Sequence, residues 1–144
     1  MKISTRGRYG IRLLIDLAEH TDASHVSLAS VAERQGISIR YLEQVAVILR
    51  RAGFIRSVKG ASGGYTLARL PQDIIIGDAL RELEGDMLVV DPPLPTVKET
   101  RIQRCIRLTV FDRINERIAA VIDRKTLASL VGTIDPEDSY MYFI

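Results

Sequence analysis

One glycine-rich, basic segment limits the fold of this chain more than any other feature. It reads RSVKGASGGYTL over residues 56–67, and its tip connects two short runs of β-prone residues at 54–58 and 65–68. A P-loop would need lysine and then serine or threonine after its last glycine, but Tyr65 follows Gly64. The spacing of a dinucleotide-binding loop is absent as well. The segment is therefore either an ordinary hairpin turn or a hairpin whose small, cationic tip approaches a large anion.

Three helices are predicted before this hairpin. Apolar residues recur at helical spacing within residues 5–20, 28–35 and 39–51, and a serine precedes each run. The second and third helices are joined by a short turn that contains Gly36, which is the arrangement of a helix-turn-helix. Three helices followed by a hairpin with a basic tip make a winged helix. The predicted fold class is thus mainly α with a small β-hairpin, a winged helix-turn-helix.

A long amphipathic helix is predicted near the C-terminus. A short helix over residues 76–84 and a linker with three prolines within residues 91–95 precede it. The long helix runs from Lys98 to about Arg124, roughly 40 Å at 1.5 Å per residue. We expect such a helix to pack against a second subunit; the alternative is burial against its own domain. The expected dimerisation residues are Ile102, Ile106, Val110, Ile114, Ile118 and Ile122.

Basic residues are concentrated in the first half of the chain. Residues 1–70 contain eleven Lys and Arg against five Asp and Glu, whereas residues 71–144 contain nine against thirteen. A basic half predicts a polyanionic partner, although an uneven spread of surface charge without a function is the alternative. We expect a winged helix-turn-helix DNA-binding domain over residues 1–85, a proline-rich linker over 86–97, and a dimerisation helix with a C-terminal tail over 98–144.

Catalysis, metal binding and membrane insertion are not expected. The sequence has no Ser/His/Asp, Cys/His or metal-hydrolase motif, and His20 and His25 are expected to be exposed loop residues rather than metal ligands. Asp16 interrupts the first apolar stretch, so neither a signal peptide nor a membrane span is predicted. We therefore expect a cytoplasmic protein that is not an enzyme and has no cofactor.

Two further groups of side chains are interpreted as ordinary structure. The single cysteine, Cys105, excludes an internal disulfide, and its apolar neighbours favour a buried thiol over a redox sensor. The carboxylates of Glu82, Glu84 and Asp86 are interpreted as a solvated helix end rather than a catalytic site.

Several short motifs occur in a fixed order along the chain: ISTRGRYG (residues 3–10), GIS (36–38), YLEQ (41–44), AG (52–53) and GGY (63–65). Together they resemble the BadM/Rrf-type family of bacterial winged-helix transcription regulators. The resemblance is dense over residues 1–85 and extends to the long helix. It implies a homodimer that crosses its long C-terminal helices and binds double-stranded DNA at an imperfect inverted repeat.

The cysteine content indicates a branch within that family. The members that bind an iron–sulfur cluster carry three cysteines between the short helix and the long helix, whereas residues 85–108 contain Cys105 alone. The chain therefore resembles the cluster-free CymR branch, and so does its ending, YMYFI at residues 140–144. The resemblance implies a repressor of cysteine and sulfur metabolism genes, with cysteine synthase as a signalling partner. The alternatives are a metal-, cluster- or redox-sensing regulator of the same family, and a winged-helix protein-interaction module.

The resemblance and the chemistry of the side chains together predict a DNA-binding surface. The start of the third helix is expected in the major groove, the wing tip in the minor groove, and the start of the first helix on phosphates, through side chains and free backbone amides. Arg34, Arg50 and Arg51 either clamp the DNA backbone or are solvated. Glu43 either accepts from a cytosine or pairs with Arg40. The predicted DNA-binding residues are Thr5, Arg6, Arg8, Ser38, Arg40, Tyr41, Glu43, Gln44, Lys59, Gly60, Ala61 and Ser62.

Overall fold

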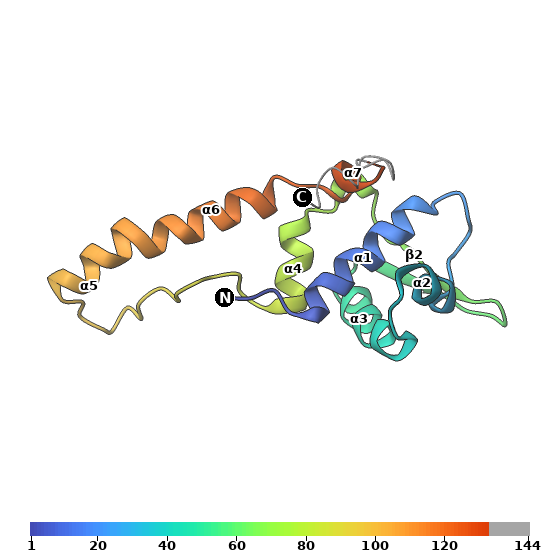
Figure 1. The fold of residues 1–144 in the computed structure, drawn as a ribbon, viewed down its shortest axis with the longest axis horizontal. Coiled ribbons are helices and arrows are strands. Elements are labelled where there is room, and N and C mark those ends of the chain that lie inside the picture. The colour runs from blue at the N-terminus through green and yellow to red at the C-terminus, as the bar shows by residue number, and fades with distance from the viewer. Residues whose placement is uncertain (133–144) are drawn as a thin grey trace, which may run out of the picture.

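The computed structural model describes residues 1–132 of the chain and consists mainly of helices with one hairpin (Figure 1). Helices α1, α2, α3 and α4 gather with the hairpin at one end of the molecule, and a long arm made of α5 and α6 extends from the other (Figure 1). The bounds are α1 (Thr5–Glu19), α2 (Leu28–Gln35), α3 (Ile39–Arg51), β1 (Ile55–Val58), β2 (Gly64–Leu67), α4 (Ile76–Glu84), α5 (Arg101–Ile106), α6 (Asp112–Asp123) and α7 (Leu127–Leu130).

Local capping explains where the helices of the helix-turn-helix begin and end. The Ser27 hydroxyl accepts a hydrogen bond from the Ser30 amide at the start of α2 (3.2 Å), and Ser38 accepts from the Tyr41 amide at the start of α3 (3.1 Å). Gly36 follows α2 with a φ of 63°, a left-handed conformation that glycine adopts without strain. The predicted boundaries of these two helices are confirmed.

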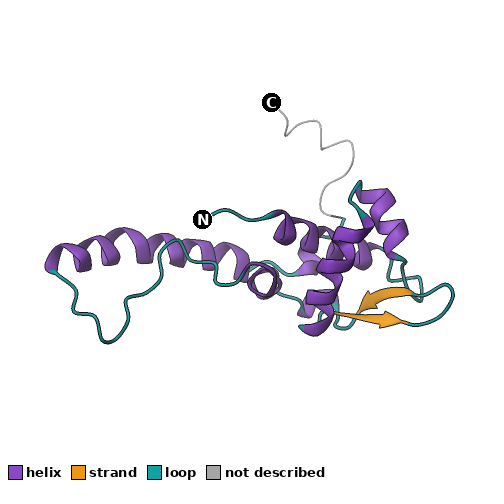
Figure 2. Ribbon diagram, turned by 90° about the horizontal axis from the view of Figure 1, so that it is seen from below, coloured by secondary structure: helices purple, strands orange, loops and turns teal. Residues whose placement is uncertain are grey.

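The hairpin forms a two-stranded antiparallel sheet whose register runs from Ile55 opposite Leu67 to Val58 opposite Gly64 (Figure 2). Its second strand also pairs with the loop before α2, because Val26 and Tyr65 exchange two backbone hydrogen bonds of 2.8 Å. A side chain at Gly64 would collide with the backbone of Val26. The hairpin is therefore fixed to the helices at its base, and residues 59–62 form an exposed tip.

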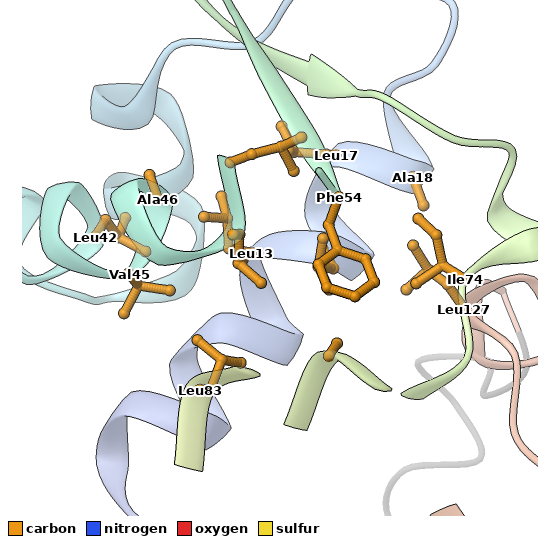
Figure 3. Packing of buried hydrophobic residues seen from close by; sticks show 14 of the residues in the cluster. Leu13, Leu17, Ala18, Leu42, Val45, Ala46, Phe54, Ile74, Leu83 and Leu127 are labelled. Atoms are coloured by element: carbon orange, nitrogen blue, oxygen red, sulfur yellow. The ribbon is translucent and has the colours of Figure 1, made fainter. Parts of the chain in front are cut away.

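The hydrophobic core lies between α1, α3 and α4. One buried cluster contains Leu13 and Leu17 of α1, Leu42 and Val45 of α3, and Phe54, which follows α3; Leu13 lies on the side of Val45, and Leu17 lies near Phe54 (Figure 3). The apolar positions expected on the inner sides of these helices are buried, so the amphipathic pattern of the sequence is confirmed.

The chain returns to this core after the long arm. The Leu127 side chain is fully buried in the same cluster (Figure 3), and the Leu127 amide donates to the Ile74 carbonyl (2.8 Å). The Ile76 amide donates to the Lys125 carbonyl (2.9 Å). The segment that follows α6 is thus part of the hydrophobic core of the winged-helix end of the molecule.

The long arm contains a π-helical turn that the sequence did not predict. The arm begins at Arg101, after Thr100 and Gln103 form a capping box, and a π-helical turn (Arg107–Phe111) joins α5 to α6. Residues four apart advance by about 40° around a regular α-helix, so a stripe with that spacing would wind around it. One extra residue in a π-turn sets later positions back by about 100°. The turn therefore keeps the residues with four-residue spacing nearer one side of the arm.

No helix within residues 1–132 is long and apolar enough to cross a bilayer.

Candidate nucleic-acid interface

Helix α3 presents polar side chains on the face opposite the core. Leu42, Val45 and Leu49 are fully buried, whereas the side chains of Arg40, Glu43 and Gln44 are exposed near its N-terminal end. Ser38 is exposed and caps the helix. Within residues 1–132, Arg40 and Glu43 form no ion pair within 4 Å, so the predicted alternative of a paired Glu43 is not observed.

Tyr41 has a structural contact that the sequence did not predict. Its ring meets the ring of Tyr9 edge to face, with centroids 5.2 Å apart and an interplanar angle of 78°. The Arg12 guanidinium lies 5.3 Å from the centroid of the Tyr9 ring on the same helix. Tyr41 is half-buried and holds α3 against α1, and its expected contact with DNA stays a prediction.

A buried carboxylate sets the position of α2 relative to α1. Asp16 is 1% exposed and accepts two hydrogen bonds from Arg34, from Nε (3.0 Å) and from Nη2 (2.7 Å), and a third from the Gln35 side chain (3.1 Å). Burial raises the pKa of Asp16, but the hydrogen bonds from Arg34 and Gln35 outweigh it and hold the pKa below its ordinary value. Arg34, expected either to clamp DNA or to be solvated, is occupied by this pair.

The first turn of α1 does not offer all of its amides to a phosphate. The Ser4 and Gly7 amides each donate to Oε1 of Glu84 at 2.9 Å, and the Ser4 hydroxyl donates to the same atom at 2.6 Å. The interpretation of Glu84 as a solvated helix end is therefore wrong, and free amides at these two residues are excluded. Arg6 and Arg8 are exposed, and Thr5 accepts a hydrogen bond from Arg8 (3.2 Å).

The wing tip is exposed from Lys59 to Ser62. His25 donates from Nε2 to the carbonyl oxygen of Ser62, and Ser24 donates its hydroxyl to Nδ1 of His25 (2.9 Å). His20 donates from Nδ1 to the Asp16 carbonyl (2.7 Å). Both histidines are half-buried rather than exposed, and His25 ties the wing to the loop between α1 and α2.

Comparison with known proteins decides the family. A sequence model of the Rrf2 family, described as an iron-dependent transcriptional regulator, matches residues 3–133. The chain belongs to the Rrf2 family. It is 37% identical to the HTH-type transcriptional regulator CymR of Bacillus subtilis over 145 residues, covering all of both chains. It is also 38% identical to the rrf2 protein of Nitratidesulfovibrio vulgaris over 135 residues, covering 91% of this chain and 87% of that one.

Solved structures of Rrf2 proteins have the same fold. The structure of CymR, described as the global cysteine regulator of B. subtilis, matches with a TM-score of 0.80 and 37% identity, over 94% of this chain and 99% of that one. The structure of IscR from T. potens matches with a TM-score of 0.76 and 39% identity, over 99% and 97%. The winged-helix fold is confirmed, and this chain is a DNA-binding transcriptional regulator of a family whose members are not enzymes.

The long arm of this Rrf2 protein exposes apolar side chains along much of its length. Ile102, Ile106, Val110 and Ile114 are 67%, 41%, 44% and 39% exposed. Ile118 and Ile122, predicted for the same dimerisation face, are half-buried and pack in part against the core of their own chain. Met1, Ile3 and Met87 lie beside them and line an apolar hollow at the base of the arm.

The residues of this Rrf2 protein do not fit an iron–sulfur cluster. Such a cluster takes several cysteine ligands, and the full chain has one cysteine. Within residues 1–132, no three His, Cys, Asp or Glu side chains lie together as metal ligands. Cys105 is exposed in the single chain, so the expectation of a buried thiol is not met by this chain alone.

An ion-pair network lies around the π-helical turn of the arm. Arg107 lies in the π-helical turn and pairs with Glu99 (2.6 Å), two residues before the arm begins, and with Asp112 (3.1 Å), the first residue of α6. The Arg107 guanidinium lowers the pKa of Glu99 through its hydrogen bonds. The pair with Glu99 fastens the segment just before the arm to the π-helical turn by charge.

Proposed function

We propose that this chain is a homodimeric repressor that binds an imperfect inverted repeat in DNA and controls genes of cysteine and sulfur metabolism. One observation carries the DNA-reading part of the proposal. The polar N-terminal end of α3, the tip of the wing and the start of α1 all expose cations. The cations are Arg40 on α3, Lys59 on the wing, and Arg6 and Arg8 on α1.

The side chains on α3 have the donors and acceptors that base edges require. Arg40 can donate two hydrogen bonds to guanine O6 and N7, Gln44 can pair with adenine, and Glu43 can accept from cytosine N4. Ser38 can donate to a phosphate, and residues 60–62 of the wing are small enough for their backbone to approach the minor groove. Arg6, Arg8 and Thr5 would then contact phosphates through their side chains, because Glu84 occupies two neighbouring amides.

The exposed apolar side of the arm supports a homodimer. Isoleucine and valine side chains at residues 102–114 lie in water in the single chain, and a second copy of the same helix would cover them. A dimer would place two α3 helices about one or two turns of DNA apart, roughly 34 Å per turn. The operator should then consist of two half-sites related by inversion.

Similarity to CymR supports the choice of target genes. The B. subtilis protein with 37% identity is described as the global cysteine regulator, and this chain shares its full length. A cysteine synthase is the signalling partner that this similarity suggests. Residues 140–144, a candidate segment for docking that partner, lie outside the described residues.

The DNA-reading role is tested with Arg40→Ala and, as a control, Arg113→Ala, which removes an exposed arginine from the arm. Operators are first selected from random duplexes with the wild-type protein, and affinity is then measured by fluorescence anisotropy. We expect Arg40→Ala to weaken binding to the selected operator by about 10- to 100-fold and to bind random duplex almost normally. An Arg40→Ala protein that bound the operator as tightly as the wild type would contradict the proposal.

The proposed partner is tested by a pull-down with purified cysteine synthase, with and without O-acetylserine. Retention of the enzyme that depends on O-acetylserine supports a signal carried by a protein. No retention in either condition rejects this partner and leaves the DNA-reading role to the anisotropy experiment.

The exposure of Cys105 favours one second candidate, a redox-sensing regulator of the same family. Peroxide should then reduce operator binding by the wild type but not by Cys105→Ser. Equal responses of the two proteins would reject a redox role for this thiol.

A further inference from the structure

A single carboxylate oxygen holds the first turn of α1 from across the domain. Oε1 of Glu84 accepts hydrogen bonds from the Ser4 amide (2.9 Å), the Ser4 hydroxyl (2.6 Å) and the Gly7 amide (2.9 Å). Ser4 stands at the N-cap position of α1, but its hydroxyl makes no capping bond within the helix. The last residue of α4 therefore performs the capping that a local side chain usually provides.

Two glycines allow α4 to come this close. Gly7 and Gly10 are one turn apart on the buried side of α1, and a side chain at Gly7 would collide with the Glu84 carboxylate. A side chain at Gly10 would collide with Leu83 in the same way. The approach of the two helices is thus built into the sequence of α1, and it brings a negative charge to the positive end of that helix.

Helix α4 is also fixed to the long arm. Arg81, one turn before Glu84, donates two hydrogen bonds to Asp123 at the end of α6, of 2.8 and 2.9 Å. The Arg81 guanidinium lowers the pKa of Asp123, so that carboxylate remains charged in neutral solution. Glu84 therefore connects the first turn of α1 to a helix that is itself held by the arm.

The residues that Glu84 holds surround the predicted phosphate contacts. Ser4 and Gly7 lie on either side of Thr5 and Arg6, and Arg8 follows directly. We propose that Glu84 is a positioning residue for DNA binding, which fixes the first turn of α1 so that Arg6 and Arg8 are directed at backbone phosphates. This inference rests on the proposed function, because it assigns Glu84 a role in the same interface.

The experiment compares Glu84→Ala, which removes the acceptor, with Glu84→Gln, which keeps an acceptor oxygen and loses the charge. Glu82→Ala is the matched control, because Glu82 is exposed on the same helix. The affinity of each protein for one 30-base-pair duplex is measured by anisotropy over a fourfold range of salt. All measurements are made at a temperature where circular dichroism shows every variant folded.

We expect Glu84→Ala to weaken binding at low salt and to reduce the salt slope, log K against log salt, by about 2. That reduction corresponds to one phosphate fewer neutralised by each subunit of a dimer, at about 0.9 per phosphate. Glu84→Gln should keep the wild-type slope, since its amide oxygen can accept the same three hydrogen bonds. Glu82→Ala should match the wild type in both slope and affinity.

A purely structural role predicts a different pattern. Glu84→Ala would then melt at a lower temperature but bind with the wild-type slope, and the inference would be wrong while the proposed function stood. If Glu84→Ala does not fold, Ser4→Ala replaces it, since that change removes one of the three donors; an unchanged slope there would also overturn the inference. If the wild type binds no duplex, the proposed function fails and the inference fails with it.

Discussion

Replacing the buried Asp16 by asparagine should remove a large part of the stability of the helix-turn-helix. The carboxylate accepts two hydrogen bonds from Arg34 and one from Gln35, and it is almost inaccessible to water. Asparagine has nearly the same shape, but it offers one acceptor oxygen and places an NH2 group against donors that the carboxylate had accepted from. The change therefore isolates charge and hydrogen bonding from packing.

The magnitude follows from the exposure of the two partners. Breaking a buried ion pair by removing one member costs about 3–5 kcal/mol. The Arg34 side chain is 37% exposed and can be partly rehydrated, so we take the lower end, about 3 kcal/mol. With a urea m-value of about 2 kcal/mol/M, the unfolding midpoint should fall by about 1.5 M.

The assay is urea unfolding followed by far-ultraviolet circular dichroism, at one protein concentration for all variants, from pH 7 to pH 3. The folded-state pKa of Asp16 lies below its ordinary value of 3.8, so its contribution is fully present above about pH 5. The contribution is lost as the pH falls through 3.8 and below. The difference between wild type and Asp16→Asn should therefore be constant from pH 7 to 5 and shrink towards pH 3.

The control is Asp22→Asn, because Asp22 is an exposed carboxylate in the loop that follows α1. It should unfold within about 0.5 kcal/mol of the wild type. A loss below about 1 kcal/mol for Asp16→Asn, or a difference that stays the same at pH 3 as at pH 7, would refute the assignment of stability to this carboxylate.

Three further changes test the packing and the arm. Leu127→Ala should lower the free energy of unfolding by about 2–5 kcal/mol in urea titrations, because its side chain is fully buried, and half-buried Leu130→Ala should cost less. Gly10→Ala should lower the melting temperature. Overpacking against Leu83 costs about 1–3 kcal/mol of stability, and the higher helix propensity of alanine returns only about 1 kcal/mol. Ile114→Glu should sediment as a monomer while Arg113→Gln stays dimeric; a dimeric Ile114→Glu would reject the arm as the interface.

Elements whose limits depend on local chemistry could be predicted from the sequence. Ser27, Gly36 and Ser38 act within one turn of their own helices, and the structure has each where the pattern predicts it. The glycines of the wing likewise predicted a hairpin, because the turn between two strands needs small residues. The order of helices and strands in the winged helix can be predicted from such signals, because each depends only on residues close to it in the sequence.

Contacts between distant segments could not be predicted in this way. Glu84 lies 80 residues from Ser4, and Asp16 lies 18 residues from Arg34, so neither pairing has a sequence period that reveals it. Signals were nevertheless present. A charged residue within the apolar stripe of α1 indicates a buried partner, and two glycines three residues apart in a helix indicate a close neighbouring backbone.

The exposed apolar side of the arm was predicted in outline, but the division of its residues between that side and the core of their own chain was not. The four-residue spacing predicted which residues form the apolar stripe of the arm, yet Ile118 and Ile122 of that stripe pack in part against the core of their own chain. The π-helical turn changes which positions of the arm lie on the same side. Arg107, the first residue of this turn, pairs with Glu99 and Asp112, and the spacing of apolar residues could not predict these ion pairs.

The return of Leu127 to the core restricts how such proteins can be recombined. Replacing everything after the proline-rich linker of this chain by the corresponding part of a relative would take Leu127 away from the surroundings of Ile74 in which it packs. Chimaeras of this chain in which only the wing or α3 is replaced should therefore fold. A chimaera whose junction separates residue 74 from residue 127 should be unstable.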